Sequence, residues 1–200
     1  MIELESAEQT GFDFADLVRE HQSMVFSLSY HFLHDRELAE EVSQEVFLTL
    51  HRHLADIKSG AHAVFWLRKV AAQRAIDAAR RRKRRPQVAL EEVAEPAARA
   101  AVHDPMLREV LRRLVATLPE APRMVMVMRY QEDLDPAEIA ELLEMPLGTV
   151  KSHLQRSLAL LREKLERRGV GGRVLPWLLR IDSLISSPPP RASSSNSKSS

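Results

Sequence analysis

The sequence predicts an all-α protein made of two small helical domains, residues 1–85 and 106–168, joined by a flexible linker. Apolar residues recur at intervals of three and four through most of the chain, as they do on one face of a helix. Residues 86–105 interrupt this pattern with three prolines and no sustained apolar face. Because 44% of the 200 residues are apolar, each half has enough apolar side chains to bury a core.

The first domain is expected to contain three helices. Apolar spacing places the first over residues 14–32 and the second over 38–54, with Asp35 as the N-cap of the second. A polar loop over residues 56–63 then leads into a third, long helix over 64–85. These three helices are predicted to form a single helical domain.

The second domain is expected to begin with a helix near Met106 that ends before Pro119. Pro122 is well placed to open the next helix, PRMVMVMRYQ. The alternation of Met and Val in that stretch also fits a short buried strand. The helical neighbours favour a helix.

Residues 135–165 have the layout of a helix-turn-helix, which is the most informative feature of the chain. The first helix carries apolar residues at i, i+3 and i+4 spacing: Ile139, Leu142 and Leu143. A tight turn over 145–148 precedes a second helix that opens at Thr149 with polar and basic side chains. Such a helix meets the edges of DNA bases at its start. The motif predicts a DNA-binding protein, although two helices joined by a short turn also occur as simple packed structure.

Residues 169–200 form a C-terminal extension. Apolar residues from Trp177 to Ile185 follow Pro176 at the spacing of a short amphipathic helix, which would dock on this protein or on a partner. The last stretch, SSPPPRASSSNSKSS, has nothing to bury and is expected to be disordered.

Composition excludes several classes of protein. The chain has no cysteine, so it has no disulfide and no thiolate site. Its acidic start lacks the apolar run of a secretory signal. No apolar stretch is long enough to span a membrane, so we expect a soluble cytoplasmic protein. His51 and His53 lie near several glutamates but are two residues apart on a helix, so they do not converge on a metal. We expect no catalytic residues, no metal and no cofactor.

Charge is distributed unevenly in the first domain. Residues 1–61 carry twelve acidic and four basic side chains, a net charge of −8, whereas residues 62–85 carry nine basic and one acidic, a net charge of +8. A dense basic block suits a phosphate backbone, and an acidic region suits a basic protein surface. Both could also be ordinary solvated faces.

The third helix combines this basic block with aromatic residues. Phe65 and Trp66 lead into Arg68 and then into the run RRRKRR. Rings beside a basic track suit single-stranded or melting DNA, because bases stack on the rings while phosphates follow the cations. We expect Phe65 and Leu67 to belong to the core, and leave open whether Trp66 does.

Four stretches in this order resemble a bacterial extracytoplasmic-function (ECF) sigma factor, the compact branch of the sigma-70 family. The first domain resembles sigma region 2 in EEVSQEVFLTL and WLRKVAAQRAIDAARRRKRR, and the second resembles region 4 in LPEAPRMVMVMRY and EIAELLEMPLGTVKSHLQRSLALLREKL. The likeness covers roughly residues 12–168. It implies a protein that brings core RNA polymerase to specific promoters and starts transcription.

The resemblance also implies roles for individual residues. Four fall where region 2 binds the beta-prime clamp helices of core RNA polymerase: Ser43, Gln44, Glu45 and Phe47. Five belong to the part that melts and reads the minus-ten element: Trp66, Gln73, Asp77, Arg80 and, in the basic run, Arg81. Arg68 is added to these as a DNA contact. The loop over 58–63, with Lys58, Gly60 and His62, corresponds to one that receives a flipped minus-ten base.

In region 4, five residues fall on the helix that reads the minus-thirty-five element: Thr149, Lys151, Ser152, His153 and Arg156. Further implied partners are promoter DNA, the beta subunit of core polymerase and an anti-sigma factor that holds the protein off DNA. The acidic linker would enter the active-site cleft of the polymerase.

The chain departs from the family pattern at three positions. Gln73 stands where Asn is common, and TVKSHLQRS stands where family members often have TVKSRLxRA, so His153 replaces Arg and Ser157 replaces Ala. The sequence TVKSHL also resembles the output domain of LuxR-like regulators. That alternative requires a receiver or ligand domain, whereas the amino-terminal half here is predicted to be helical.

Overall fold

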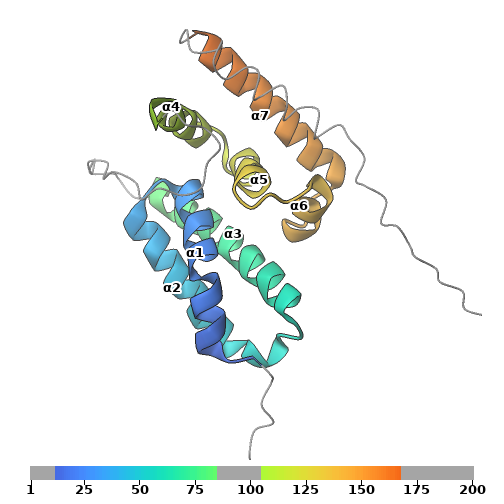
Figure 1. Ribbon diagram of the computed structural model, residues 1–200. Helices are drawn as coiled ribbons and strands as arrows, with labels where there is room; N and C mark the ends of the chain where they lie inside the picture. Colours follow the sequence, from blue (N-terminus) through green and yellow to red (C-terminus); the bar gives the residue numbers. More distant parts are fainter. Residues whose placement is uncertain (1–11, 85–104, 168–200) are drawn as a thin grey trace, which may run out of the picture.

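The computed structural model describes residues 12–84 and 105–167, and all regular structure in these two ranges is helical (Figure 1). This confirms the all-α prediction. The linker predicted at 86–105 lies outside the described residues except for Pro105, which already begins a helix. The extension predicted at 169–200 also lies outside them. No helix within the described ranges is long and apolar enough to cross a membrane.

The first domain is a bundle of α1 (Phe14–Leu33), α2 (Arg36–Arg52) and α3 (Gly60–Arg84), each in contact with the other two (Figure 1). Asp35 caps α2 as predicted, because its carboxylate accepts a hydrogen bond of 3.0 Å from the backbone N–H of Leu38. His34, between α1 and α2, has a φ of 53°, which turns the chain sharply from one helix into the next.

The buried face of α3 is built mainly from small side chains. Alanine there lets α1 and α2 approach closely, and five alanines are fully or almost fully buried: Ala63, Ala71, Ala72, Ala75 and Ala78. Leu67 is fully buried on the same helix, as predicted. Phe65 packs against the core but is only partly buried, and Trp66 has the same intermediate exposure.

The loop before α3 is shorter than predicted, since α3 begins at Gly60 rather than at Val64. Ser59 explains the earlier start. Its hydroxyl accepts a hydrogen bond of 3.1 Å from the backbone N–H of His62, and the Nδ1 atom of His62 accepts one of 3.2 Å from the backbone N–H of Lys58. These two hydrogen bonds satisfy the backbone N–H groups of His62 and Lys58 at the helix start. A short 3₁₀ helix, η1 (Leu54–Asp56), overlaps the predicted loop only at Asp56, so residues 57–59 form the connection to α3.

The second domain consists of α4 (Pro105–Ala116), α5 (Glu120–Tyr130), α6 (Pro136–Leu142) and α7 (Leu147–Arg167). The first three helices all contact α7, the longest of the four. The second domain is therefore a small bundle built around α7.

The Met and Val stretch forms α5 and is not a strand. The helix begins at Glu120, two residues before Pro122, because proline is tolerated in the first turn, where backbone N–H groups have no partner within the helix. Residues 124–128 are all buried, including both faces of the helix. This explains why their alternation imitated a buried strand.

The helix-turn-helix is formed by α6 and α7. Asp135 and Glu138 form a capping box at the start of α6, with Pro136 in its first turn. The second helix begins at Leu147, two residues before Thr149, so the turn is shifted from 145–148 to 143–146.

The two domains pack directly against each other, which the sequence did not predict. In Figure 1, α5 lies between the first domain and α7, and it contacts both α1 and α3. Arg123 of α5 reinforces this packing. Its guanidinium lies 5.2 Å above the ring of Phe32 and donates hydrogen bonds to the carbonyls of Phe32 (3.3 Å) and Leu118 (2.9 Å).

Candidate nucleic-acid interface

One face of α3 gathers four of the five residues predicted to read the minus-ten element. At 100° per residue, Trp66, Gln73, Asp77 and Arg80 fall within an arc of about 60°. Gln73, Asp77 and Arg80 are exposed, and the half-buried ring of Trp66 lies 6.1 Å from the ring of His53. The helix therefore presents one aromatic residue and three polar residues on one stripe.

Arg68 lies on the opposite side of α3 from this stripe. Its Nε atom is 2.9 Å from Oε2 of Glu132, which follows α5, and the side chains are 23% and 5% exposed respectively. Burial raises the pKa of the Glu132 carboxyl, against the opposing effect of the Arg68 charge. In this conformation the Arg68 guanidinium is paired with a carboxylate of the second domain.

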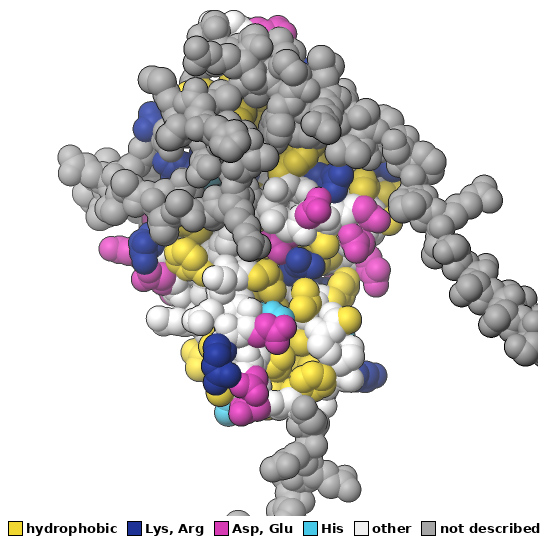
Figure 2. Space-filling view, in the orientation of Figure 1, with side chains coloured by type: hydrophobic (Ala, Val, Ile, Leu, Met, Phe, Trp, Pro, Cys, Tyr) yellow, Lys and Arg dark blue, Asp and Glu magenta, His cyan; other side chains and the backbone are white. Residues whose placement is uncertain are grey.

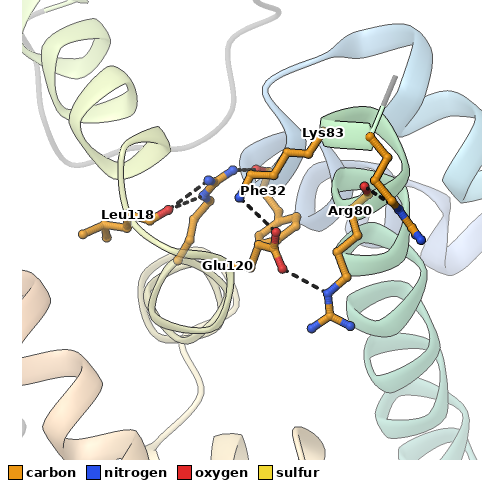
Figure 3. A network of polar contacts seen from close by, with 7 residues as sticks. Phe32, Arg80, Lys83, Leu118 and Glu120 are labelled. Atoms are coloured by element: carbon orange, nitrogen blue, oxygen red, sulfur yellow. Dashed lines mark hydrogen bonds and ion pairs between the residues drawn. The ribbon is translucent and has the colours of Figure 1, made fainter. Parts of the chain in front are cut away.

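Arg80 and Lys83, near the end of α3, are also bound by the second domain. Glu120, the first residue of α5, accepts hydrogen bonds of 3.0 Å from Arg80 Nε and 3.1 Å from Lys83 Nζ (Figure 3). Hydrogen bonding to Arg80 first, and to Lys83 next, lowers the pKa of the Glu120 carboxyl. Arg80 thus belongs to the predicted reading stripe but is engaged elsewhere.

A third carboxylate completes the pattern. Glu144, in the turn of the helix-turn-helix, lies 2.6 Å from Nζ of Lys69. Together with Glu120 and Glu132, it gives the second domain three carboxylates that bind cations of α3. These carboxylates present to α3 the negatively charged oxygens that DNA phosphates also carry.

The acidic and basic blocks of the first domain are not two separate surfaces. Arg82 of α3 pairs with Asp35 at 3.1 Å, and Arg74 and Arg81 each lie 3.9 Å from the carboxylate of Glu45 on α2. On the face seen in Figure 2, acidic and basic side chains of the described residues are interspersed. Arg81, predicted as a DNA contact, is therefore within reach of a carboxylate of its own domain.

The four residues predicted to bind core polymerase differ in how exposed they are and in what they contact. Gln44 is exposed, Phe47 packs against the core, and Glu45 faces the arginines of α3. The hydroxyl of Ser43 donates a hydrogen bond of 2.7 Å to the carbonyl of Ala39. Gln44 is thus the residue of the four that is most available to a partner.

Leu48 was missed in the prediction. It is 59% exposed and lies one turn after Gln44 on the outer face of α2. The signal was present in the sequence, because Leu48 stands outside the buried stripe of Val42, Val46 and Leu50.

The residues expected in a base-receiving loop occupy different places. Lys58 is exposed before the helix, whereas Gly60 and His62 belong to the first turn of α3, which corrects the loop assignment. His62 precedes Trp66 by one turn, so it joins the same side of α3 as the reading stripe.

In α7, buried Val150 and Leu154 fix which side of the recognition helix faces outward. The predicted readers divide into exposed Lys151 and Arg156, and half-buried Thr149, Ser152 and His153. Ser157 is only 3% exposed, so its position requires a small side chain, as Ala provides in the family pattern.

Two exposed side chains in the first half of α7 were not among the predicted DNA contacts. Leu147 is 42% exposed and Gln155 is exposed, and both lie four residues from Lys151. Gln155 could have been found from the sequence by its spacing from Lys151. Leu147 could not, because the predicted turn included it.

The histidines considered as metal ligands have other neighbours. The ring of His51 meets the ring of Phe14 edge-on at 5.1 Å, and Nδ1 of His53 lies 3.0 Å from Asp56. Within residues 12–84 and 105–167, no group of three or more His, Asp or Glu is placed to hold a metal.

Comparison with known proteins agrees with this two-part arrangement. Residues 17–85 match the family model "Sigma-70 region 2", and residues 108–161 match "Sigma-70, region 4". The matches coincide with the two helical domains. The chain therefore belongs to the sigma-70 family of RNA polymerase sigma factors.

The curated relatives place it in the ECF branch of that family. The chain is 29% identical over 167 residues to the ECF RNA polymerase sigma factor SigW of Bacillus subtilis, an alignment that covers 76% of this chain and 88% of SigW. It is 30% identical over 158 residues to the ECF RNA polymerase sigma factor SigE of Mycolicibacterium smegmatis, covering 76% of this chain and 61% of that protein. The LuxR-like alternative is not favoured.

A solved structure shares the fold. CnrH, in complex with the cytosolic domain of CnrY, superposes with a TM-score of 0.55 at 18% sequence identity, covering 77% of this chain and 88% of CnrH.

Proposed function

We propose that this chain acts in the cytoplasm as the promoter-reading subunit of RNA polymerase and carries out no chemistry itself. In this assignment α3 opens and reads the minus-ten element, and α7 reads the minus-thirty-five element. The observation that supports it most is the occurrence of two separate polar reading faces, one on α3 and one on α7, in the two matched regions. Gln44 and Leu48 on α2 would dock on the beta-prime clamp helices.

The packing of the domains supports a closed free state that cannot bind a promoter. Glu120, Glu132 and Glu144 bind cations of α3 that DNA phosphates would need. Core polymerase would separate the domains, so that α3 and α7 reach two promoter elements at once. DNA binding by the free chain is therefore expected to be weak.

An anti-sigma factor is the remaining proposed partner. CnrH, which shares the fold, is held in a complex with the cytosolic domain of another protein. A protein that stabilised the closed packing of α3 against the second domain would prevent this chain from binding promoters.

The decisive experiment mixes the purified chain with core RNA polymerase and genomic fragments, and then maps the transcript starts. We expect starts that share two sequence elements and that require the chain. Core polymerase without the chain is the control. Failure to form a complex, or starts without a shared sequence, would overturn the proposal.

A further inference from the structure

Leu147 places an apolar side chain on the outside of the helix-turn-helix. It is 42% exposed, and only Leu48 accompanies it as an exposed large hydrophobic residue in the part of the chain that the structure describes. Its neighbours Leu143 and Met145 pack against the core, whereas Leu147 does not. Leaving such a side chain in water forgoes the stabilisation that burial would bring, so a partner that covers it gains that free energy.

The position of Leu147 indicates which surface covers it. Leu147, Lys151 and Gln155 follow one another at intervals of four residues, and all three are exposed. Residues at this spacing lie along one side of a helix. Val150 and Leu154 are buried on the other side and hold α7 in that orientation. Leu147 is therefore the first residue of the outward stripe, at the end of a recognition helix that enters a major groove.

The major groove offers one apolar group on its base edges, the C5-methyl group of thymine. Leu147 lies one helical turn before Lys151 on the same side of α7. Its side chain can cover that methyl group while the Lys151 ammonium stays near a phosphate or a base acceptor. Adjacent Gly148 has no side chain, and a Cβ atom built there meets nothing within 4 Å. The surface beside Leu147 is thus open to a close approach by DNA.

We propose that Leu147 is a specificity-determining residue that recognises a thymine methyl group in the upstream promoter element. This inference rests on the proposed role of α7 and adds an apolar contact to the polar side chains proposed to read the element. A protein surface of the polymerase is the other apolar partner that could cover Leu147, and the test separates the two.

The test removes the apolar group from each partner in turn. Holoenzyme, assembled from core polymerase and the full chain, is bound to a duplex whose transcript start has been mapped. Each thymine of the upstream element is replaced in turn by deoxyuridine, which removes only the methyl group. With the native chain, one such replacement is expected to weaken binding by about fourfold, the effect of losing one buried methyl group. With Leu147→Ala, the thymine and uracil duplexes are expected to bind equally.

Two further variants keep the outcome clear. Leu147→Val retains methyl groups and is expected to recover part of the discrimination. Glu163→Ala, on the same helix about 24 Å away, is expected to retain all of it, and circular dichroism checks that every variant is folded. The proposal is overturned if no thymine in the element discriminates, or if Leu147→Ala keeps the native ratio. It is also overturned if Leu147→Ala weakens both duplexes while keeping that ratio, which would place Leu147 on the polymerase. The absence of shared promoter elements in mapped transcripts would instead refute the proposed function.

Discussion

The Nε atom of Arg68 lies 2.9 Å from Oε2 of Glu132, and this ion pair joins the middle of α3 to the turn that follows α5. The Glu132 side chain is only 5% exposed, so its charge depends on Arg68 for compensation. The same contact that stabilises the closed packing withdraws from solvent a cation predicted to bind DNA.

Breaking this pair from one side is expected to be costly. Glu132→Met leaves the Arg68 guanidinium without its carboxylate and should lower the free energy of unfolding by roughly 3 kcal/mol. Arg68→Met combined with Glu132→Met should recover most of that loss, because two apolar side chains leave no unpaired charge. Denaturant unfolding of Arg68→Met, Glu132→Met and the double variant measures the coupling. Additive effects of the single changes would show that the pair is not coupled.

Glu144 offers a way to open the contact without weakening the fold. Its φ of 53° is unfavourable for a residue with a Cβ atom, and its side chain binds Lys69. Glu144→Gly relieves the backbone and is expected to leave the melting temperature unchanged or to raise it by about 2–4 °C, while the domains separate more easily.

Lys69→Ala is the matched control, because it breaks the same pair without relieving the backbone. Calorimetry gives the melting temperature, and small-angle scattering gives the radius of gyration of each variant. If Glu144→Gly melts below Lys69→Ala, the backbone at Glu144 is not strained.

His31 should make stability depend on pH. Burial, aided by the charge of Arg112, lowers its pKa from 6.5 to about 4. Since the folded pKa is depressed, the folded state binds a proton less readily than the unfolded chain. The contribution that neutral His31 makes to the stability of the folded state is therefore complete above pH 6.5, and it is lost as the pH falls towards 4.

The loss from this residue between pH 7 and pH 5 should be about 2 kcal/mol. Denaturant unfolding of the native chain and of His31→Gln at both pH values isolates that contribution. Identical pH dependence in the two proteins would mean that His31 does not titrate as its burial implies.

The exposed face of α2 should determine affinity for core polymerase. Leu48→Ala is expected to weaken holoenzyme assembly by about tenfold with little effect on stability, because this side chain is 59% exposed in the free chain. Fluorescence titration with core polymerase measures the affinity. Leu147→Ala, the same change at the other exposed leucine, is the control and should leave assembly unchanged. Assembly as tight with Leu48→Ala as with the native chain would contradict the prediction.

Lys151 and Arg156 are exposed and form no ion pair with another described residue, so they remain available to DNA. If they contact bases, Lys151→Ala and Arg156→Ala should each cost about 1–3 kcal/mol of holoenzyme binding to its promoter, with little loss on unrelated DNA. Gel-shift titration with the promoter duplex and with an unrelated duplex distinguishes base contacts from phosphate contacts. Equal loss on every sequence would identify them as phosphate contacts.

Local interactions determined most of the secondary structure, and these can be read from the sequence. Asp35 and the pair Asp135 and Glu138 cap helices with side chains only a few residues from the N–H groups they bind. Errors arose where a local partner was overlooked, as with Ser59, which starts α3 four residues earlier than predicted. In α5 the buried faces erased the usual periodicity and left a strand open as an alternative. Its start was placed two residues late because proline is tolerated within the first turn.

By itself, the sequence determined the all-helical class, the two domains and the likeness to sigma regions 2 and 4, since periodicity, caps and motifs depend on residues close together in the chain. Only the tertiary structure decided which of the predicted DNA-contacting side chains are exposed and which are paired with carboxylates. Glu120 and Glu132 lie 40 and 64 residues from Arg80 and Arg68, and no local pattern pairs them. Such pairs form because packing α5 against α1 and α3 buries apolar surface and brings opposite charges within hydrogen-bond distance.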